Sequence, residues 1–182
     1  MPIVRIETAR LRLRPYRRSD LAALHALFTD PGVRRYLLDG EVVSRDWVAE
    51  EIRGSLACFA DRGFGQWAIL ARDGGDLIGF AGYRYFHQPP ELQLLYGLAP
   101  AHWNRGLATE TARAMIRWGF EQHGFDVIRA STDAPNAASI RVLEKAGMRF
   151  EKRVLVGGLD TVYYRLARED FEPGDEAYAI IE

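Results

Sequence analysis

The sequence between residues 98 and 110 decides the fold, and it reads Leu98-Ala99-Pro100-Ala101-His102-Trp103-Asn104-Arg105-Gly106-Leu107-Ala108-Thr109-Glu110. It predicts a strand that ends near Leu98, a short loop, and a helix that starts at Gly106. Small residues at 106 and 108 let a ligand approach the backbone, and the first turn of a helix presents unpaired N–H groups. With the guanidinium of Arg105 beside it, this helix start is suited to a pyrophosphate. The simpler alternative is that Gly106 only begins the helix and Ala108 only packs closely.

Hydrophobic periodicity around this stretch predicts a mixed α/β chain. Helical spacing is expected at 21–28, 45–61, 106–123 and 136–146, and strand patterns at 10–16, 67–71, 77–85, 92–98, 127–132, 150–156 and 161–166. The segment 92–132 forms a strand–helix–strand unit, which requires a right-handed crossover and parallel pairing. The remaining strands are expected to be antiparallel, in a mixed sheet with helices on both faces.

The length of 182 residues fits one domain. Because no linker, repeat or low-complexity run divides the chain, we expect a single domain over 1–182 with a core over 6–168. The tail, 169–182, holds six acidic residues and no basic residue. It is expected to be a solvated terminus or to end in a weak strand at 178–181.

The composition describes a chain that can bury a core but has no strong attraction to polyanions. Hydrophobic residues make up 48% of the chain, and 24 basic side chains nearly balance 25 acidic ones. The net charge of −1 therefore predicts neither nucleic acid nor a membrane as a direct partner. Arginine supplies 22 of the basic residues, which a genome-wide codon bias explains for the most part.

Cysteine usage and the missing motifs disfavour several classes of protein. Cys58 is the only cysteine, so no internal disulfide is expected, and its apolar helical setting favours a core position over a nucleophile. The sequence has no Gly-Lys pair of a P-loop, no H-E-x-x-H and no G-x-S-x-G, and no G-x-G-x-x-G follows a strand. Dehydrogenases, NTPases and zinc or serine hydrolases are disfavoured, and no metal is expected. Without a signal peptide or a long apolar run, the chain is expected to be cytoplasmic.

Two blocks of sequence resemble the GCN5-related N-acetyltransferase (GNAT) superfamily. Residues 100–111 resemble its motif A, especially the P-x-x-W-G-[KR]-G-[YL]-[AG]-T-E of a subgroup that includes the Rim-type ribosomal-protein N-terminal acetyltransferases. Residues 136–148, Asn-Ala-Ala-Ser-Ile-Arg-Val-Leu-Glu-Lys-Ala-Gly-Met, are similar to the subgroup's N-x-x-S-x-x-[VL]-[LM]-E-K-x-G-[FM]. Residues 8–20 and 79–82 fit as well, so the resemblance covers residues 6–168.

This resemblance implies a mixed, mostly antiparallel twisted sheet whose central parallel strands, 92–98 and 127–132, splay apart to hold acetyl-CoA. The pantetheine arm would pair with the backbone near Leu98, and the pyrophosphate would meet the N–H groups of residues 105–109. Asn136 would contact the pantetheine arm, although it would equally serve as a helix cap. The implied cofactor-binding residues are Leu98, Trp103, Asn104, Arg105, Gly106, Leu107, Ala108, Thr109 and Asn136.

The implied reaction is direct attack of a neutral primary amine on the thioester of acetyl-CoA, in a ternary complex. Two positions depart from the family pattern, because the usual tyrosine is Leu143 and the usual strand glutamate is Gln93. We nominate Ser139 as the proton donor to the thiolate. Glu91, on the same strand face as Gln93, is the candidate base, and its alternative is a solvated loop residue.

Hypotheses of two other classes remain open. The missing tyrosine and glutamate would suit a CoA-binding module without transferase activity. The six arginines between residues 5 and 18 would suit a protein that docks on the ribosome, although a solvated strand face is the simpler explanation. The sequence does not separate a peptide N-terminus from a small-molecule amine as the acceptor, and it is compatible with a homodimer.

Overall fold

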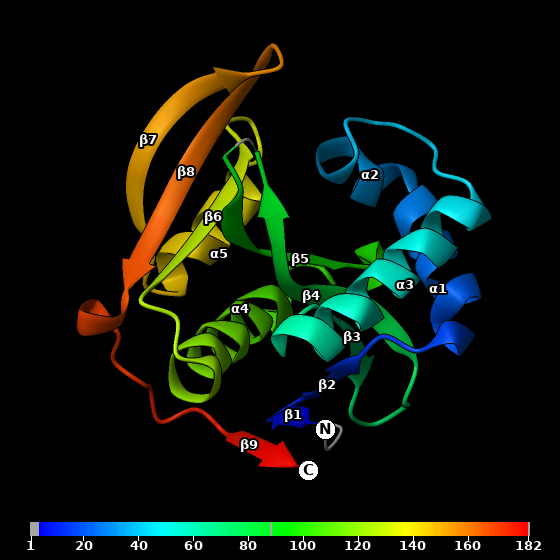
Figure 1. Cartoon of the computed structure of the whole chain (residues 1–182), viewed down its shortest axis with the longest axis horizontal. Helices are drawn as coiled ribbons and strands as arrows, with labels where there is room; N and C mark the ends of the chain where they lie inside the picture. Colours follow the sequence, from blue (N-terminus) through cyan, green and yellow to red (C-terminus); the bar gives the residue numbers. More distant parts are fainter. Residues whose placement is uncertain (1–3, 88, 182) are drawn as a thin grey trace.

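One sheet runs through the computed structural model, which describes residues 4–87 and 89–181. Its nine strands, counted over these residues, lie in the order β7-β8-β6-β5-β4-β3-β2-β1-β9 (Figure 1). The strands are β1 (Arg5–Thr8), β2 (Leu11–Pro15), β3 (Gln66–Ala71), β4 (Leu77–Phe86), β5 (Glu91–Leu98), β6 (Val127–Asp133), β7 (Arg149–Val156), β8 (Leu159–Ala167) and β9 (Tyr178–Ile181). The helices are α1 (Leu21–Thr29), α2 (Pro31–Leu37), α3 (Arg45–Arg62), α4 (Leu107–Trp118) and α5 (Ala137–Lys145). Short helical turns lie at Arg18–Asp20, Pro100–His102, Gly119–His123 and Arg168–Asp170.

The parallel contact of the described sheet joins β5 to β6 through a single register pair, Gln93 with Arg129. The other neighbouring strands pair antiparallel. This arrangement confirms the predicted mixed, mostly antiparallel sheet. Because β5 continues to Leu98 without pairing to β6, the two strands part beyond residue 93.

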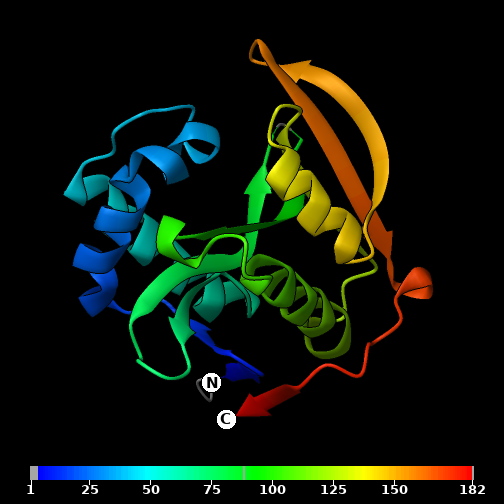
Figure 2. The same ribbon diagram turned by 180° about the vertical axis from the view of Figure 1, so that it is seen from behind.

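Helices cover both faces of the sheet, as predicted (Figure 1 and Figure 2). On one face, α1 and α3 bury an apolar cluster that includes Leu24 and Phe28. On the other face, α4 and α5 pack on a larger cluster. There α4 buries Thr111, Met115 and Trp118, whose spacing by four and three residues places them on one side of the helix.

The sheet ends in two strands from opposite ends of the chain. No strand is predicted at residues 5–8, yet β1 pairs with β2 on one side and with β9 on the other. Residues 178–181 thus form a strand, which is one of the two outcomes expected for the tail. The two termini therefore lie close together (Figure 1).

The helix α2 is not predicted either, because the Asp-Pro-Gly sequence at 30–32 indicates a stop. The break is real, but a new helix begins at Pro31, immediately after it. The carboxylate of Asp30 accepts hydrogen bonds from the N–H groups of Gly32 at 2.8 Å and Val33 at 3.2 Å. A proline at the first helical position has no N–H that would need an acceptor, so this sequence caps a second helix as well as it ends the first.

Arginines near the N-terminus form ion pairs within the chain. Arg12 Nε lies 2.9 Å from Glu7 Oε1. Arg14 and Asp20, both buried, form a two-point pair in which each N–O distance is 2.7 Å. Asp20 is the N-cap residue of α1, but its carboxylate makes no capping hydrogen bond to that helix. It binds Arg14 and accepts a hydrogen bond from the N–H of Arg17 at 2.7 Å.

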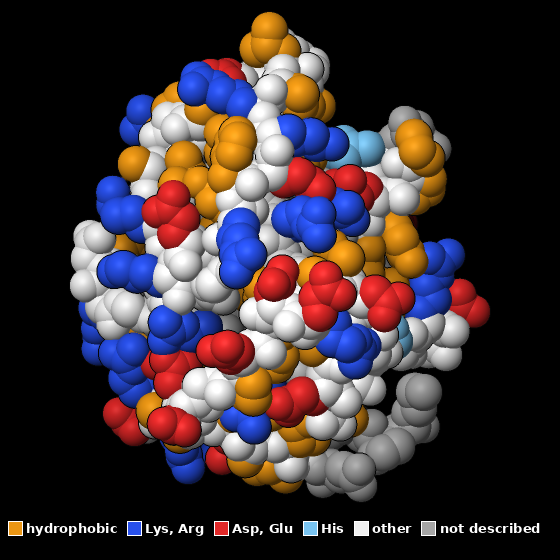
Figure 3. All heavy atoms as spheres, turned by 90° about the vertical axis from the view of Figure 1, so that its left-hand side faces the viewer, with side chains coloured by type: hydrophobic (Ala, Val, Ile, Leu, Met, Phe, Trp, Pro, Cys, Tyr) orange, Lys and Arg blue, Asp and Glu red, His pale blue; other side chains and the backbone are white. Residues whose placement is uncertain are grey.

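Charges of both signs are interspersed over the face that carries β7 and β8 (Figure 3). Hydrophobic side chains gather toward the top of this view. On β7, Leu155 is 75% exposed and Phe150 is 58% exposed. Of the six arginines between residues 5 and 18, Arg10, Arg12 and Arg14 form ion pairs within the chain. Among the helices of the described residues, none has the length and apolar character needed to cross a membrane.

The variant Asp20→Asn tests the buried ion pair. Without the carboxylate charge the Arg14 guanidinium is buried without an anion, so we expect the free energy of unfolding to fall by about 3–5 kcal/mol. Urea denaturation measures this loss. The control is Glu50→Gln, which removes half of an exposed pair with Arg53 on α3 and should leave stability close to that of the wild type. A loss at Asp20 no larger than at Glu50 would contradict the importance of the pair.

Candidate active site

A cavity of about 930 Å³ opens where β5 and β6 part. Its lining includes the end of β5, the loop before α4, the first turn of α4, the end of β6 and part of α5, and it extends to α1, α2 and α3. The predicted site residues in this lining are Leu98, Trp103, Asn104, Gly106, Leu107, Ala108, Thr109, Asn136 and Ser139. Arg105 and Glu91, both described, are not part of the lining. The fold thus brings the two sequence blocks to one cavity.

The loop before α4 has a backbone that shapes a helix start. Asn104 and Gly106 adopt left-handed conformations, with φ values of 57° and 77°. The N–H of Glu110 donates to the carbonyl of Gly106 at 3.0 Å, so the N–H groups of Leu107, Ala108 and Thr109 precede the first helical bond. These three residues line the cavity, which makes the helix start a suitable cradle for an anion.

The indole of Trp103 fixes the loop to the strand before it. Its Nε1 donates to the carbonyl of Leu98 at 2.7 Å. Gly32 of α2 lies against the same ring, because a Cβ at Gly32 would come within 2.8 Å of Trp103 Cη2. The ring therefore bridges β5 and α2 at the edge of the cavity.

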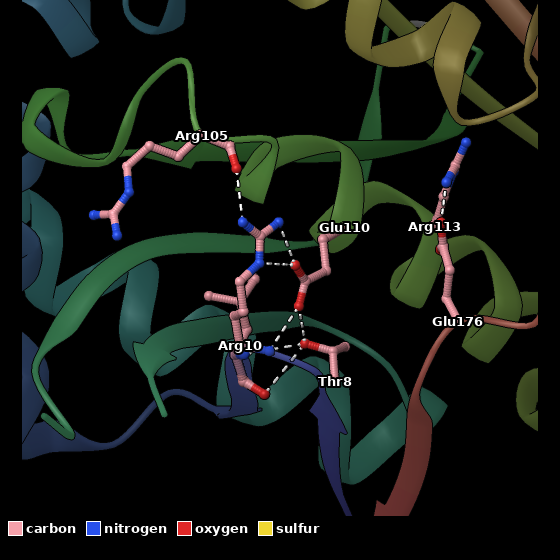
Figure 4. A network of polar contacts seen from close by, with 7 residues as sticks. Thr8, Arg10, Arg105, Glu110, Arg113 and Glu176 are labelled. Atoms are coloured by element: carbon pink, nitrogen blue, oxygen red, sulfur yellow. Dashed lines mark hydrogen bonds and ion pairs between the residues drawn. The ribbon is translucent and has the colours of Figure 1, made fainter. Parts of the chain in front are cut away.

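The carboxylate of Glu110 joins α4 to the N-terminal strands (Figure 4). It accepts hydrogen bonds from Thr8 Oγ1 at 2.6 Å, from the N–H of Arg10 at 2.9 Å and from Arg10 Nε at 2.7 Å. Arg10 Nη1 donates in turn to the carbonyl of Arg105 at 2.8 Å. Glu110 thus lies outside the lining of the cavity and supports the loop from below, and the Arg105 side chain extends away from this network (Figure 4).

Asn136 caps α5, the alternative that the sequence left open. Its Oδ1 accepts from the N–H of Ser139 at 3.2 Å, and its Nδ2 donates to Thr132 Oγ1 at 3.1 Å. The amide therefore joins the end of β6 to the start of α5 while it lines the cavity. Capping and contact with a ligand in the cavity are compatible at this residue.

Two hydroxyl groups meet across the cavity between β5 and α5. Tyr96 Oη lies 3.0 Å from Ser139 Oγ. Burial raises the pKa of Tyr96, so its hydroxyl keeps its proton. The position at which the family resemblance places a tyrosine is Leu143, which is fully buried in the core. A tyrosine hydroxyl is therefore present, but β5 supplies it instead of α5, and no spacing rule in the sequence connects Tyr96 with Ser139.

A hydrogen-bond network surrounds Gln93, which is 2% exposed. Gln93 Nε2 donates to Glu91 Oε1 at 2.8 Å and lies 3.2 Å from His87 Nε2, while Ser131 Oγ donates to Gln93 Oε1 at 2.6 Å. Glu91 also lies 3.8 Å from Arg129. Sequence reasoning misses His87, because the four histidines are scattered along the chain and only the turn after β4 brings this one to the cavity.

Cys58 lies apart from the lining of this cavity. Cys58 packs half-buried against the core, as expected, and burial raises the pKa of its thiol. Within residues 4–87 and 89–181, no group of three or more His, Cys, Asp or Glu side chains is placed to hold a metal ion.

The variant Glu110→Gln tests the support beneath the loop. It removes the charge that holds Arg10, so we expect the free energy of unfolding to fall by about 1–3 kcal/mol and the amide hydrogens of residues 103–109 to exchange faster. Urea denaturation and hydrogen exchange measure the two effects. The control is Glu176→Gln, which breaks the exposed pair with Arg113 on the same helix (Figure 4). Equal exchange in the loop of both variants would contradict the assigned support.

Comparisons with known proteins agree with this geometry. Residues 10–149 match the family model described as an acetyltransferase (GNAT) domain. The uncharacterized protein YkkB of Bacillus subtilis is 33% identical over 82% of this chain and 88% of its own length. The uncharacterized N-acetyltransferase YoaA of the same organism is 31% identical over 80% of this chain and 83% of its own length.

Solved structures share the fold. A GNAT-family acetyltransferase from Bacillus anthracis superposes with a TM-score of 0.77 at 23% identity and covers 91% of this chain and 99% of its own. The aminoglycoside acetyltransferase AAC(6')-Ib in complex with coenzyme A superposes with a TM-score of 0.73 at 21% identity and covers 88% of this chain and 96% of its own. The narrower likeness to Rim-type enzymes stays a prediction.

Proposed function

The chain belongs to the acetyltransferase (GNAT) family of N-acetyltransferases, and from this premise we propose that it moves an acetyl group from acetyl-CoA to a primary amine. The amine belongs to a peptide N-terminus or a small molecule and attacks directly in a ternary complex. One observation carries the proposal: a single cavity joins the helix start of α4 to the gap between β5 and β6 and to the space beside α1–α3. Such a cavity has room for a cosubstrate and an acceptor together.

The residues present fit acetyl-CoA. The N–H groups at residues 105–109 and the left-handed Gly106 form a helix start that favours phosphate oxygens. Arg141 and Lys145 of α5 add positive charge to the same lining. The edge of β5 that β6 leaves unpaired, near Leu98, offers backbone groups to a pantetheine arm. Trp103, Asn104 and Asn136 complete the proposed binding site, and the neighbour solved with coenzyme A supports this choice of cosubstrate.

Acetyl-CoA supplies the thioester on which the amine acts. Ser139 and Tyr96 hold a proton at hydroxyl oxygens in the cavity, so this pair is placed to donate it to a departing sulfur. A backbone N–H of β5 near Leu98 is the proposed donor to the oxyanion. Glu91, nominated as the base, lies outside the cavity lining, and the Gln93 amide that binds its carboxylate cannot accept a proton. We therefore give Glu91 an electrostatic part, in which its charge favours a positive charge beside it.

The acceptor part of the cavity favours an amine with little additional positive charge. The aromatic side chains in this part of the lining are Phe28, Tyr36, Trp47 and Phe86. The carboxylates among the described lining residues are Glu51 and Asp133, and Glu51 already accepts a hydrogen bond from Arg84 Nη1 at 2.6 Å. A polycation such as an aminoglycoside would find few free anions here, so we propose a monoamine or a peptide N-terminus.

Release of free thiol from acetyl-CoA, measured with a panel of α-amino peptides, monoamines, polyamines and aminoglycosides, tests the function. We expect Gly106→Val to raise KM for acetyl-CoA at least about tenfold, because a β-branched residue is strained at this φ, and Asn136→Ala to raise it as well. Gly54→Val is the control, since Gly54 has open space around it on α3. A normal KM in both site variants would show that the site is misplaced, and tight CoA binding in calorimetry without thiol release would favour a non-catalytic module.

The variants Ser139→Ala and Tyr96→Phe test the proton donor. A thiolate with a pKa near that of cysteine, about 8.5, leaves without full protonation, so we expect kcat to fall by less than about 10²-fold. KM for acetyl-CoA should stay near the wild-type value. Because the hydroxyls form one pair, the double variant should be no slower than the slower single variant. Additive losses would contradict their action as a unit.

A further inference from the structure

His87 lines the cavity beside Gln93. The nominated base, Glu91, lies outside the lining, whereas His87, Gln93 and Tyr163 belong to it. Gln93 stands at the strand position where the family resemblance places a glutamate, and an amide cannot accept a proton there. An imidazole lies beside this amide, because His87 Nε2 is 3.2 Å from Gln93 Nε2.

The surroundings of Gln93 fix the tautomer of this histidine. Gln93 Oε1 accepts from Ser131, and its Nε2 donates to the carboxylate of Glu91, so a flipped amide would set two acceptors against each other. The second N–H of the same nitrogen then points to His87 Nε2. In this arrangement Nε2 carries the lone pair of the ring, which the Gln93 N–H and the Tyr163 hydroxyl share.

Tyr163 connects this lone pair to the interior of the cavity. Its Oη lies 3.0 Å from His87 Nε2, and its side chain is 3% exposed. Burial, with the charge of Glu91, raises the pKa of Tyr163, so the phenol keeps its proton and is able to pass one on. Lys152 Nζ lies 4.7 Å from the centre of the Tyr163 ring.

We propose that His87 is the final acceptor of the proton of the acceptor amine and that the Tyr163 hydroxyl carries the proton to it. The ammonium N–H bond breaks as Tyr163 Oη gains a proton, and the Tyr163 O–H bond breaks as His87 Nε2 gains one. A neutral amine and an imidazolium result. This assignment rests on the proposed transferase function and names the residues that prepare the nucleophile.

The charged groups around His87 suit this role. Glu91 on β5, one amide away, stabilises the imidazolium, while Arg129 on β6 and Lys152 on β7 oppose it. The backbone of His87 is left-handed, with a φ of 69°, a conformation that costs energy in a residue with a side chain. Strain of this kind persists where the surrounding contacts fix it, and here those contacts are Gln93 and Tyr163.

The variant His87→Gln, compared with the wild type across the pH range, tests the relay. We expect kcat/KM for the amine to fall about 10²-fold near neutral pH, with KM for acetyl-CoA within twofold of the wild type. The ratio of wild-type to variant kcat/KM should shrink as the pH falls, because protonated His87 accepts nothing. The titration of the amine itself is common to both enzymes and cancels in this ratio. Added imidazole should restore part of the rate of His87→Ala.

Tyr163→Phe should cause a loss similar to that of His87→Gln, and the double variant should be no slower than either. The control is His25→Gln on α1, where the ring contacts the carbonyl of Val43, and it should leave the profile unchanged. A ratio that does not change with pH, or a wild-type rate in His87→Gln, would overturn the relay alone. A wild-type enzyme that acetylates no amine would overturn the proposed function and the relay with it.

Discussion

The organising constraint of this molecule is that β5 and β6 touch at one register pair and then part. A sheet normally closes its backbone hydrogen bonds along the whole length of neighbouring strands, and here that rule is relaxed at the centre. The strand ends on the two sides of the gap lead into α4 and α5, so two helix starts meet at one opening. The cavity, the anion cradle and the paired hydroxyls all follow from this separation.

The separation of β5 and β6 does not by itself fix the loop before α4. A set of hydrogen bonds outside the cavity fixes that loop. Glu110 binds Thr8 and Arg10, and Arg10 reaches the carbonyl of Arg105. A residue of the first helical turn thereby secures both the N-terminal strands and the loop that precedes its own helix. The negative charge of Glu110 stabilises the start of α4 electrostatically. The same carboxylate also joins α4 to the N-terminal strands through Thr8 and Arg10.

The sequence predicts those parts of the fold and site that depend on neighbours in the chain. The periodicity of α4, the glycine at its start and the cap at Asn136 are local signals, and the structure shows each of them. The contacts between Tyr96 and Ser139, and between His87 and Tyr163, join residues that are 43 and 76 positions apart. Hydrophobic periodicity cannot predict contacts between residues so far apart in sequence, because these contacts form only when the sheet has formed.

Two local predictions failed for a related reason. The segment 5–8 is too short to show an alternating pattern, and its strand exists because β2 and β9 flank it. The Asp-Pro-Gly sequence at 30–32 indicates a stop, yet the same residues begin α2. A turn signal and a cap signal use the same side-chain chemistry, so only tertiary contacts decide between them.

The strand that ends the acidic tail affects how readily the sheet can pair with the sheet of another copy of the chain. An uncovered edge strand exposes a row of backbone donors and acceptors that invites another chain to add to the sheet. β9 covers the edge of β1 and becomes the edge strand in its place, and with four residues it offers only a short row of such groups. The opposite edge strand, β7, carries four charged residues among its first five, Arg149, Glu151, Lys152 and Arg153, and a charged strand is a poor template for a second one.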